Sequence, residues 1–203
     1  MKNAVKRRKI DYIWHFTKIE NLDSILQNGL IPRATLEANN ANMEFNDLYR
    51  LDGHTDASCL SIGHPNYKMF YRLRMEDREQ EWAVVAVKRK ALWRKDCAFC
   101  YENAASNEVT SIPLLNRKGV PAFERLFIPT EGKPDRATLG LPDNCPTNPQ
   151  AEVLVFGVIE PNYISGAILP NKERENEYKA KYPNYEFLYH RAFYSARLDY
   201  QYW

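Results

Sequence analysis

The stretch Ile10-Asp11-Tyr12-Ile13-Trp14-His15-Phe16 is apolar and aromatic, which predicts a strand buried in the core. Thr17 and Glu20 follow at the spacing of a capping box, in which a Thr side chain caps a helix and a Glu three residues later caps it in return. Apolar residues continue at helical spacing over 22–26, and Gly29 is a common type of helix end. The chain is therefore expected to open with a strand, a helix and a turn.

Further strands and helices are expected along the rest of the chain. Trp82–Val87 and Gln150–Phe156 predict buried strands, whereas Asn66–Glu79 and Glu173–Lys181 predict helices. The order of these elements shows no regular alternation of strand, helix and strand, so it favours an α+β fold. The whole chain, residues 1–203, is expected to form a single domain.

Two long polar segments interrupt this pattern. Ala34–Thr55 is rich in Asn and Asp, and Pro129–Pro149 is rich in Pro, Gly and Asp. Both are expected to be surface loops. Connections of this length are uncommon in a compact domain and often carry function.

The composition is that of a globular protein, with 44% hydrophobic and 27% charged residues among 203. No stretch reaches the roughly 18 apolar residues that a membrane span needs. The segment Met1–Ile10 is charged and lacks the apolar stretch of a signal peptide. The protein is therefore expected to be cytoplasmic, with no membrane partner.

The distribution of charge is more informative than the net charge of +2. Basic residues cluster at Lys6–Lys9, at Arg72–Arg78 and at Lys88–Lys95, and 13% of all residues are aromatic. Basic groups neutralise phosphates and aromatic rings stack on unpaired bases, so this mixture suits single-stranded nucleic acid. Composition alone nevertheless favours the alternative, which is solvated surface charge with tyrosines in the core.

Several site types lack the residues that they need. Cys97 and Cys100 have the spacing of half a zinc site, but no second ligand pair accompanies them. A thiol pair that is packed in the core or touched by solvent is the favoured interpretation, and no metal is expected. The sequence also contains no GxxxxGK or GxGxxG phosphate loop and no GxSxG nucleophile elbow.

Two polar residues stand out because they accompany apolar strands. His15 lies near the end of the first predicted strand, where a hydrogen-bonded core histidine is the more common case. Glu152 opens a strongly apolar strand after a long polar loop. A carboxylate there either caps a surface or faces a cleft, and the residues alone leave both open.

Three blocks of sequence together resemble the DarT family of DNA-modifying toxins, within the ADP-ribosyltransferase superfamily. The first block, Trp14–Thr17 with the helix that follows, is similar to the family's opening strand and helix, whose His begins the NAD-binding site. The second block comprises Arg50, Ser61 and Met69–Tyr71, and resembles the conserved arginine and a later strand–helix element. The third, Gln150–Val155, is similar to the strand of the catalytic Glu. The blocks occur in the family's order.

The resemblance implies a fold of two small packed β-sheets flanked by helices, with a cleft for NAD+ between the sheets. It implies transfer of ADP-ribose from NAD+ to a base of single-stranded DNA, with release of nicotinamide. Such a toxin is expected to be paired with a macrodomain antitoxin. Because 55–67 lacks the aromatic run of the thymine-modifying branch, guanine is expected over thymine as the target base. The alternatives are an RNA or protein acceptor, or a non-enzymatic module that binds single-stranded nucleic acid.

The resemblance also implies roles for particular residues. Glu152 is expected to stabilise positive charge at the ribose and to act as base, and Arg50 to pair with the pyrophosphate, with Arg33 as its competitor. The 34–55 loop and the loop before Glu152 are expected to contact DNA. The remaining residues expected to bind NAD+ are His15 on the adenosine ribose, Phe16 and Thr17 at the nicotinamide or its ribose, Ser24 and Pro32 on the adenosine side, Tyr71 stacked on nicotinamide, and Met69.

Overall fold

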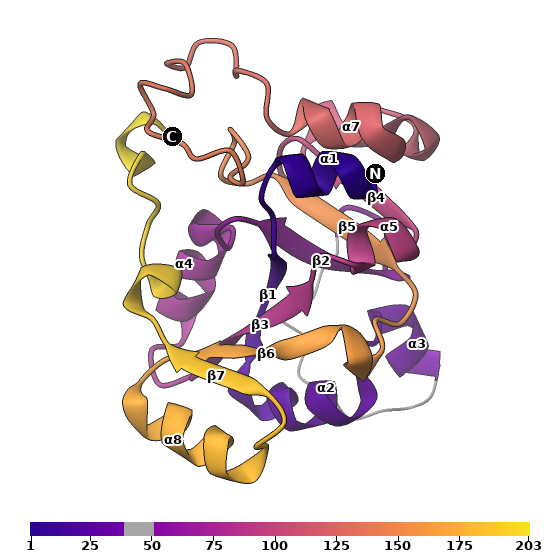
Figure 1. Cartoon of the computed structure of the whole chain (residues 1–203). Coiled ribbons are helices and arrows are strands. Elements are labelled where there is room, and N and C mark those ends of the chain that lie inside the picture. Colours follow the sequence, from indigo (N-terminus) through magenta and orange to yellow (C-terminus); the bar gives the residue numbers. More distant parts are fainter. Residues whose placement is uncertain (39–50) are drawn as a thin grey trace.

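The structure is a computed structural model that describes residues 1–38 and 51–203 (Figure 1). Its described strands form one seven-stranded sheet in the order β4-β5-β2-β1-β3-β6-β7. All neighbouring strands are antiparallel except β6 and β7, which are parallel. The strands are β1 (Tyr12–Lys18), β2 (Ala57–Ile62), β3 (Trp82–Lys88), β4 (Cys97–Cys100), β5 (Glu152–Phe156), β6 (Ile164–Leu169) and β7 (Glu186–Tyr189).

The mixed fold confirms the α+β prediction, but the expected division into two sheets is not confirmed. The reason is β1, which pairs with both halves. Against β3 its ladder runs from Tyr12 to Lys18, whereas against β2 only Ile13 and Trp14 are in register, opposite Ile62 and Ser61. A short ladder thus joins β4-β5-β2 to β3-β6-β7 in a continuous sheet.

Helices flank this sheet (Figure 1). Beside one end of it, α1 lies next to α7, and the Glu124 carboxylate accepts hydrogen bonds from Arg7 and Arg8. At the other end, α8 packs on β7. The helices are α1 (Lys2–Arg7), α2 (Leu22–Asn28), α3 (Arg33–Ala38), α4 (Tyr67–Glu76), α5 (Ala91–Arg94), α6 (Asn107–Thr110), α7 (Gly119–Arg125) and α8 (Lys172–Lys181). No helix in the described ranges is long and apolar enough to cross a membrane.

The chain opens with α1, which was not predicted, and the expected strand, helix and turn follow it. The predicted helix cap is wrong. Thr17 belongs to β1, where it pairs with Ala83 of β3, so it cannot cap a helix. The Thr17 hydroxyl instead accepts a hydrogen bond from Asn21 Nδ2 at 3.1 Å. The helix α2 begins at Leu22, directly after Asn21. Gly29 does end α2, at φ +86°, and a Cβ atom there would lie 2.2 Å from the carbonyl oxygen of Ile159.

The centre of the sheet is covered on both faces. Along β3 the side chains alternate between two clusters, because successive residues of a strand point to opposite faces. Val85 joins the main cluster, which includes Ile13, Leu22 and Phe123. Val84 joins a second cluster with Phe70 of α4 and Trp82. The strands at the centre are therefore fixed from both sides, which makes their ends a rigid support for a site.

Two expected loops differ in outcome. The stretch 129–149 contains no helix or strand, as predicted, but it is not a surface loop throughout, because residues 145–149 are buried. The predicted 34–55 loop begins instead inside α3, and its residues 39–50 lie outside the described residues.

Candidate active site

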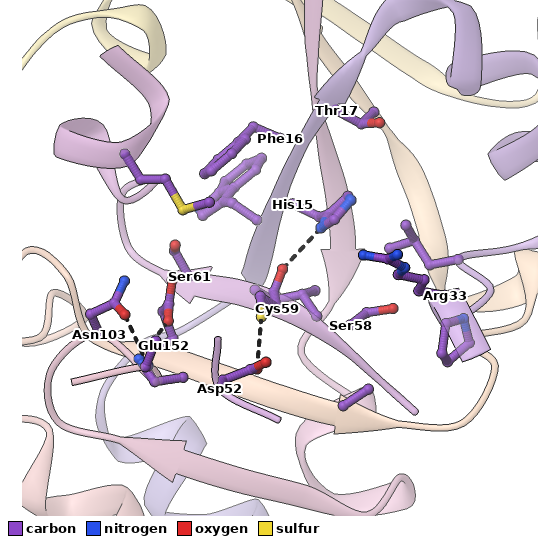
Figure 2. A pocket seen from close by; sticks show the side chains of 18 of the residues that line it. His15, Phe16, Thr17, Arg33, Asp52, Ser58, Cys59, Ser61, Asn103 and Glu152 are labelled. Atoms are coloured by element: carbon purple, nitrogen blue, oxygen red, sulfur yellow. Dashed lines mark hydrogen bonds between the residues drawn. The ribbon is translucent and has the colours of Figure 1, made fainter. Parts of the chain in front are cut away.

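A cavity of about 750 Å³ opens where β1, β2 and β5 meet α4 and the segment before α3 (Figure 2). Its size is that of a site for a small organic ligand. At one end lie Glu152, Ser61 and Asn103, and at the other lie His15 and Arg33 (Figure 2). The cavity therefore brings together the two polar residues, one from β1 and one from β5, that the sequence singled out.

Glu152 is the first residue of β5 and its side chain is buried at 6% exposure, although it lines the cavity. Its Oε2 accepts a hydrogen bond from the backbone N–H of Ala104 at 2.8 Å. Its Oε1 accepts a hydrogen bond from Nδ2 of Asn66 at 3.3 Å. Both oxygens are thus held by donors, as a buried carboxylate requires.

His15 lies on β1 and lines the same cavity. Its Nδ1 is 2.9 Å from the carbonyl oxygen of Cys59, on the neighbouring strand β2. A carbonyl oxygen can only accept, so Nδ1 carries the proton and donates it. This bond fixes the orientation of the ring (Figure 2).

The cavity wall includes most of the residues that were expected to bind NAD+. Phe16, Thr17, Pro32 and Met69 all line it, together with His15 and Glu152. Phe16 is held by stacking on Phe70, with ring centroids 4.7 Å apart and an interplanar angle of 13°.

Ser24 and Tyr71 are not among the described residues that line the cavity. The hydroxyl of Ser24 accepts a hydrogen bond from Asn28 within α2, at 3.2 Å. Tyr71 lies on α4 and is 58% exposed. The spacing of residues on α4 accounts for this result, because Met69 and Arg72 are three positions apart and share the face that Tyr71 does not.

The expected arginine, Arg50, lies outside the described residues. Its competitor Arg33 begins α3 and lines the cavity on the side of His15. The guanidinium of Arg33 donates from Nε to Glu37 at 2.5 Å, one helical turn away. Arg33 is therefore placed beside the ligand space with its orientation set by an ion pair.

Several cavity residues were missed by the sequence analysis. Asp52 and Cys59 line the cavity next to each other, with Cys59 Sγ 3.8 Å from a carboxylate oxygen of Asp52. Asn103 accepts a hydrogen bond from the N–H of Ala105 at 2.9 Å, which holds the turn that presents Ala104 to Glu152. The Glu152 contact uses a backbone group, for which the sequence contains no signal.

The two thiols of β4 are packed in the interior of the protein. Cys97 and Cys100 are buried free cysteines, and burial raises the pKa of each to about 12. Such thiols are protonated at neutral pH and unreactive. Among residues 1–38 and 51–203, no three His, Cys, Asp or Glu side chains form a group that could hold a metal ion.

The sequence and the fold were compared with known proteins. The family described as "ssDNA thymidine ADP-ribosyltransferase, DarT" matches residues 14–192. The comparison with curated proteins gives no match.

Solved structures with a similar fold include Thermosipho africanus DarTG in complex with ADP-ribose, at 21% identity and a TM-score of 0.64. That match covers 91% of this chain, which spans about half (51%) of the Thermosipho africanus chain. Thermus sp. 2.9 DarT in complex with carba-NAD+ has 13% identity and a TM-score of 0.56, over 91% of this chain and 98% of that one. The same Thermus protein in complex with ADP-ribosylated ssDNA has 13% identity and a TM-score of 0.50, over 91% and 96%.

The family description names thymidine, so the expected preference for guanine is not supported. The lack of an aromatic run in 55–67 is therefore not a guide to the target base. The family match covers most of the chain and includes both His15 and Glu152. This chain belongs to the DarT family.

Proposed function

We propose that this protein transfers ADP-ribose from NAD+ to a thymine base of single-stranded DNA and releases nicotinamide. The observation that carries the proposal is Glu152, a buried carboxylate held by two donors on the wall of a ligand-sized cavity, within the residues matched by the family. The proposal gives each part of that cavity a chemical task.

Glu152 acts on the bond that breaks. When the glycosidic bond of NAD+ cleaves, its electron pair leaves with nicotinamide and the ribose C1 becomes positively charged, as in an oxocarbenium ion. A fixed carboxylate beside C1 stabilises that charge as it develops, which is usually the largest catalytic contribution. Because Asn66 and Ala104 already hold both carboxylate oxygens, little reorganisation is needed when the charge forms.

The acceptor then supplies the new bond and loses a proton. In thymidine, N1 is bonded to the sugar, so N3 is the ring nitrogen that carries a proton. N3 attacks C1, the C1–N3 bond forms, and the N3 proton passes to the Glu152 carboxylate. An arginine stays protonated near neutral pH, which favours Glu152 over Arg50 as the base.

The rest of NAD+ is assigned to the wall that runs from Glu152 to His15. His15 binds the adenosine ribose through the ring edge opposite its bond to Cys59. Phe16, Thr17 and Met69 contact the nicotinamide half, and Pro32 lies on the adenosine side. A guanidinium fork matches the paired oxygens of the pyrophosphate, which is assigned to Arg50, with Arg33 on the cavity wall as its competitor.

Two features of the site suit a single strand of DNA. A base inside a duplex cannot reach a buried carboxylate, so the target must be unstacked or unpaired. Lys68 and Arg72 line the cavity from α4 and supply cations for the phosphates on either side of the base. The segment 34–55 and the loop before Glu152 are also proposed to contact the DNA.

We also propose that a macrodomain partner removes the ADP-ribose mark and that the protein acts as a toxin without it. Family membership supports this assignment. The test is expression of the chain in bacteria with and without a macrodomain protein. Growth arrest that the macrodomain relieves, and that Glu152→Gln abolishes, is expected. Arrest that persists with Glu152→Gln would refute the assignment.

The acceptor is tested with NAD+ and single-stranded oligonucleotides that are identical except for one central thymidine, deoxyguanosine, deoxyadenosine or deoxycytidine. Mass spectrometry is expected to find ADP-ribose on the thymidine oligonucleotide alone, with one nicotinamide released for each mark. Transfer only to deoxyguanosine would refute the choice of base. Transfer only to an RNA oligonucleotide or to protein, added as alternative acceptors, would refute the choice of DNA.

A further inference from the structure

Asn66 is a buried amide that links Glu152 to the start of α4. Its side chain is only 1% exposed, and it is not among the described residues that line the cavity. Its backbone N–H donates to Ser61 Oγ at 3.1 Å. In the side chain, Oδ1 accepts from the N–H of Met69 at 3.3 Å and Nδ2 donates to Glu152 Oε1 at 3.3 Å.

The orientation of this amide is determined by the helix that it caps. The N–H of Met69 can only donate, so the atom of Asn66 that faces it must be the oxygen. The NH₂ group is then left to point at Glu152, to which it donates. Capping of α4 and orientation of the carboxylate are therefore performed by opposite ends of one planar group.

The second donor to Glu152 comes from a different part of the chain. Ala104 N–H holds Oε2 from the segment after β4, whereas Asn66 holds Oε1 from the turn between β2 and α4. Two donors on opposite sides fix the torsion of the carboxylate as well as its position. If the Asn66 amide is lost, Oε1 loses the donor that opposes Ala104 N–H on Oε2.

We propose that Asn66 is a positioning residue of the transferase, which fixes the Glu152 carboxylate in the orientation that the reacting ribose requires. The proposal rests on the catalytic role of Glu152 proposed above. It also couples Glu152 to α4, whose Lys68, Met69 and Arg72 line the cavity.

Two substitutions separate positioning from capping. Ser and Asp are both as good as Asn at the cap of a helix, so Asn66→Ser and Asn66→Asp keep that role. Neither keeps the donor to Glu152, and Asn66→Asp places a second carboxylate against the first. A capping role alone predicts that both variants match the wild type. Positioning predicts that both lose activity and that Asn66→Asp loses more.

The experiment measures kcat for transfer to a thymidine oligonucleotide, Kd for NAD+ and the melting temperature. We expect kcat to fall on the order of 10- to 100-fold in Asn66→Ser, the range seen when groups that orient a reactive ligand are removed. Kd for NAD+ is expected to stay within about twofold, because Asn66 does not line the cavity. A Kd that rises in parallel with the loss of activity would overturn the proposal.

Asn171 provides a matched control. It caps α8 by accepting from the N–H of Arg174 at 2.8 Å, and its Nδ2 donates to Glu81 at 3.2 Å. The chemistry is that of Asn66, but neither Asn171 nor Glu81 is among the described residues that line the cavity. Asn171→Ser and Asn171→Asp are expected to keep kcat within about twofold.

A double-mutant cycle completes the test. If Asn66 acts only through Glu152, then Asn66→Ser costs nothing further in the Glu152→Gln background. An additive loss there would overturn the proposal. Full activity of Glu152→Gln itself would instead refute the proposed function. An inactive Glu152→Gln beside fully active Asn66 variants would refute the positioning role alone.

Discussion

Asp199→Asn is expected to destabilise the fold strongly, because it breaks a buried ion pair while leaving the other partner in place. Arg197 is 8% exposed and Asp199 3% exposed. Arg197 donates from Nε and Nη2 to the two Asp199 oxygens at 2.6 and 2.5 Å, and Trp203 Nε1 donates to one of them at 2.7 Å. These bonds outweigh the effect of burial and lower the pKa of Asp199 below its usual 3.8.

The magnitude follows from what Arg197 retains. Its bonds to the carbonyl oxygens of Pro146 and Thr147, at 2.8 and 2.7 Å, remain, but its charge is left uncompensated. Breaking a buried pair in this way costs about 3–5 kcal/mol. That is a large part of a total stability of roughly 5–15 kcal/mol. For a chain of this size it lowers the melting temperature by roughly 6–20 °C.

The assay is urea unfolding followed by tryptophan fluorescence at pH 7 and at lower pH. Glu76→Gln is the control, since the Arg72–Glu76 pair is 3.7 Å apart with side chains 68% and 62% exposed, and such pairs contribute less than about 1 kcal/mol. The contribution of Asp199 is present above the unfolded pKa and is lost as pH falls through the lower folded pKa. The free energies of unfolding of the wild type and of Asp199→Asn should therefore become equal in acid. If Asp199→Asn lowers the free energy of unfolding by less than about 1 kcal/mol, or by no more than Glu76→Gln does, the ion pair does not have the proposed effect.

Three further outcomes are expected. Hydrogen bonds from two lysines lower the pKa of Glu175 from 4.5 to about 2, so Glu175→Gln should reduce the free energy of unfolding at pH 7. In urea unfolding, the difference from the wild type should vanish as the pH falls from 4.5 to 2, and a difference that is constant with pH would contradict this. Gly29→Ala should lower the melting temperature by several degrees, because residue 29 has φ +86° and the added Cβ would lie 2.2 Å from a carbonyl oxygen. An unchanged melting temperature would show that the substitution causes no strain. Cys97 and Cys100 should not react with a thiol reagent at pH 8 until denaturant is added, and mass spectrometry would count the labelled cysteines. Rapid labelling in the folded protein would show that the two thiols are not buried.

Strands and helices with strong periodicity were predictable from the sequence, and long-range pairing was not. Trp82–Val87 was predicted as a buried strand and corresponds to β3, because a continuous apolar run is a local signal. The extension of β1 through Thr17 depends on its partner Ala83, which lies far away in the sequence. The joining of all strands into one sheet likewise depends on the short β1–β2 ladder, for which the sequence carries no local mark.

The same division holds for the candidate site. His15 and Glu152 were found because their blocks resemble a family, and the structure places both on one cavity. Asn66 carried a detectable signal, since it opens the predicted helix Asn66–Glu79 and Asn is a favoured helix cap, but its contact with Glu152 spans 86 residues and left no local signal. The N–H of Ala104 could not be predicted from the sequence, because every residue type except proline provides a backbone N–H.

In the proposed mechanism, a Glu152 carboxylate held inside this cavity drives transfer of ADP-ribose to DNA. The most direct test compares wild type and Glu152→Gln with saturating NAD+ and a thymidine oligonucleotide, measuring both the rate of nicotinamide release and Kd for NAD+. Removing one group that stabilises developing charge costs on the order of 10²–10³ in rate. We expect Glu152→Gln to show this loss in the rate of nicotinamide release, with an unchanged Kd for NAD+. A Glu152→Gln protein that transfers ADP-ribose within about threefold of the wild-type rate would contradict it.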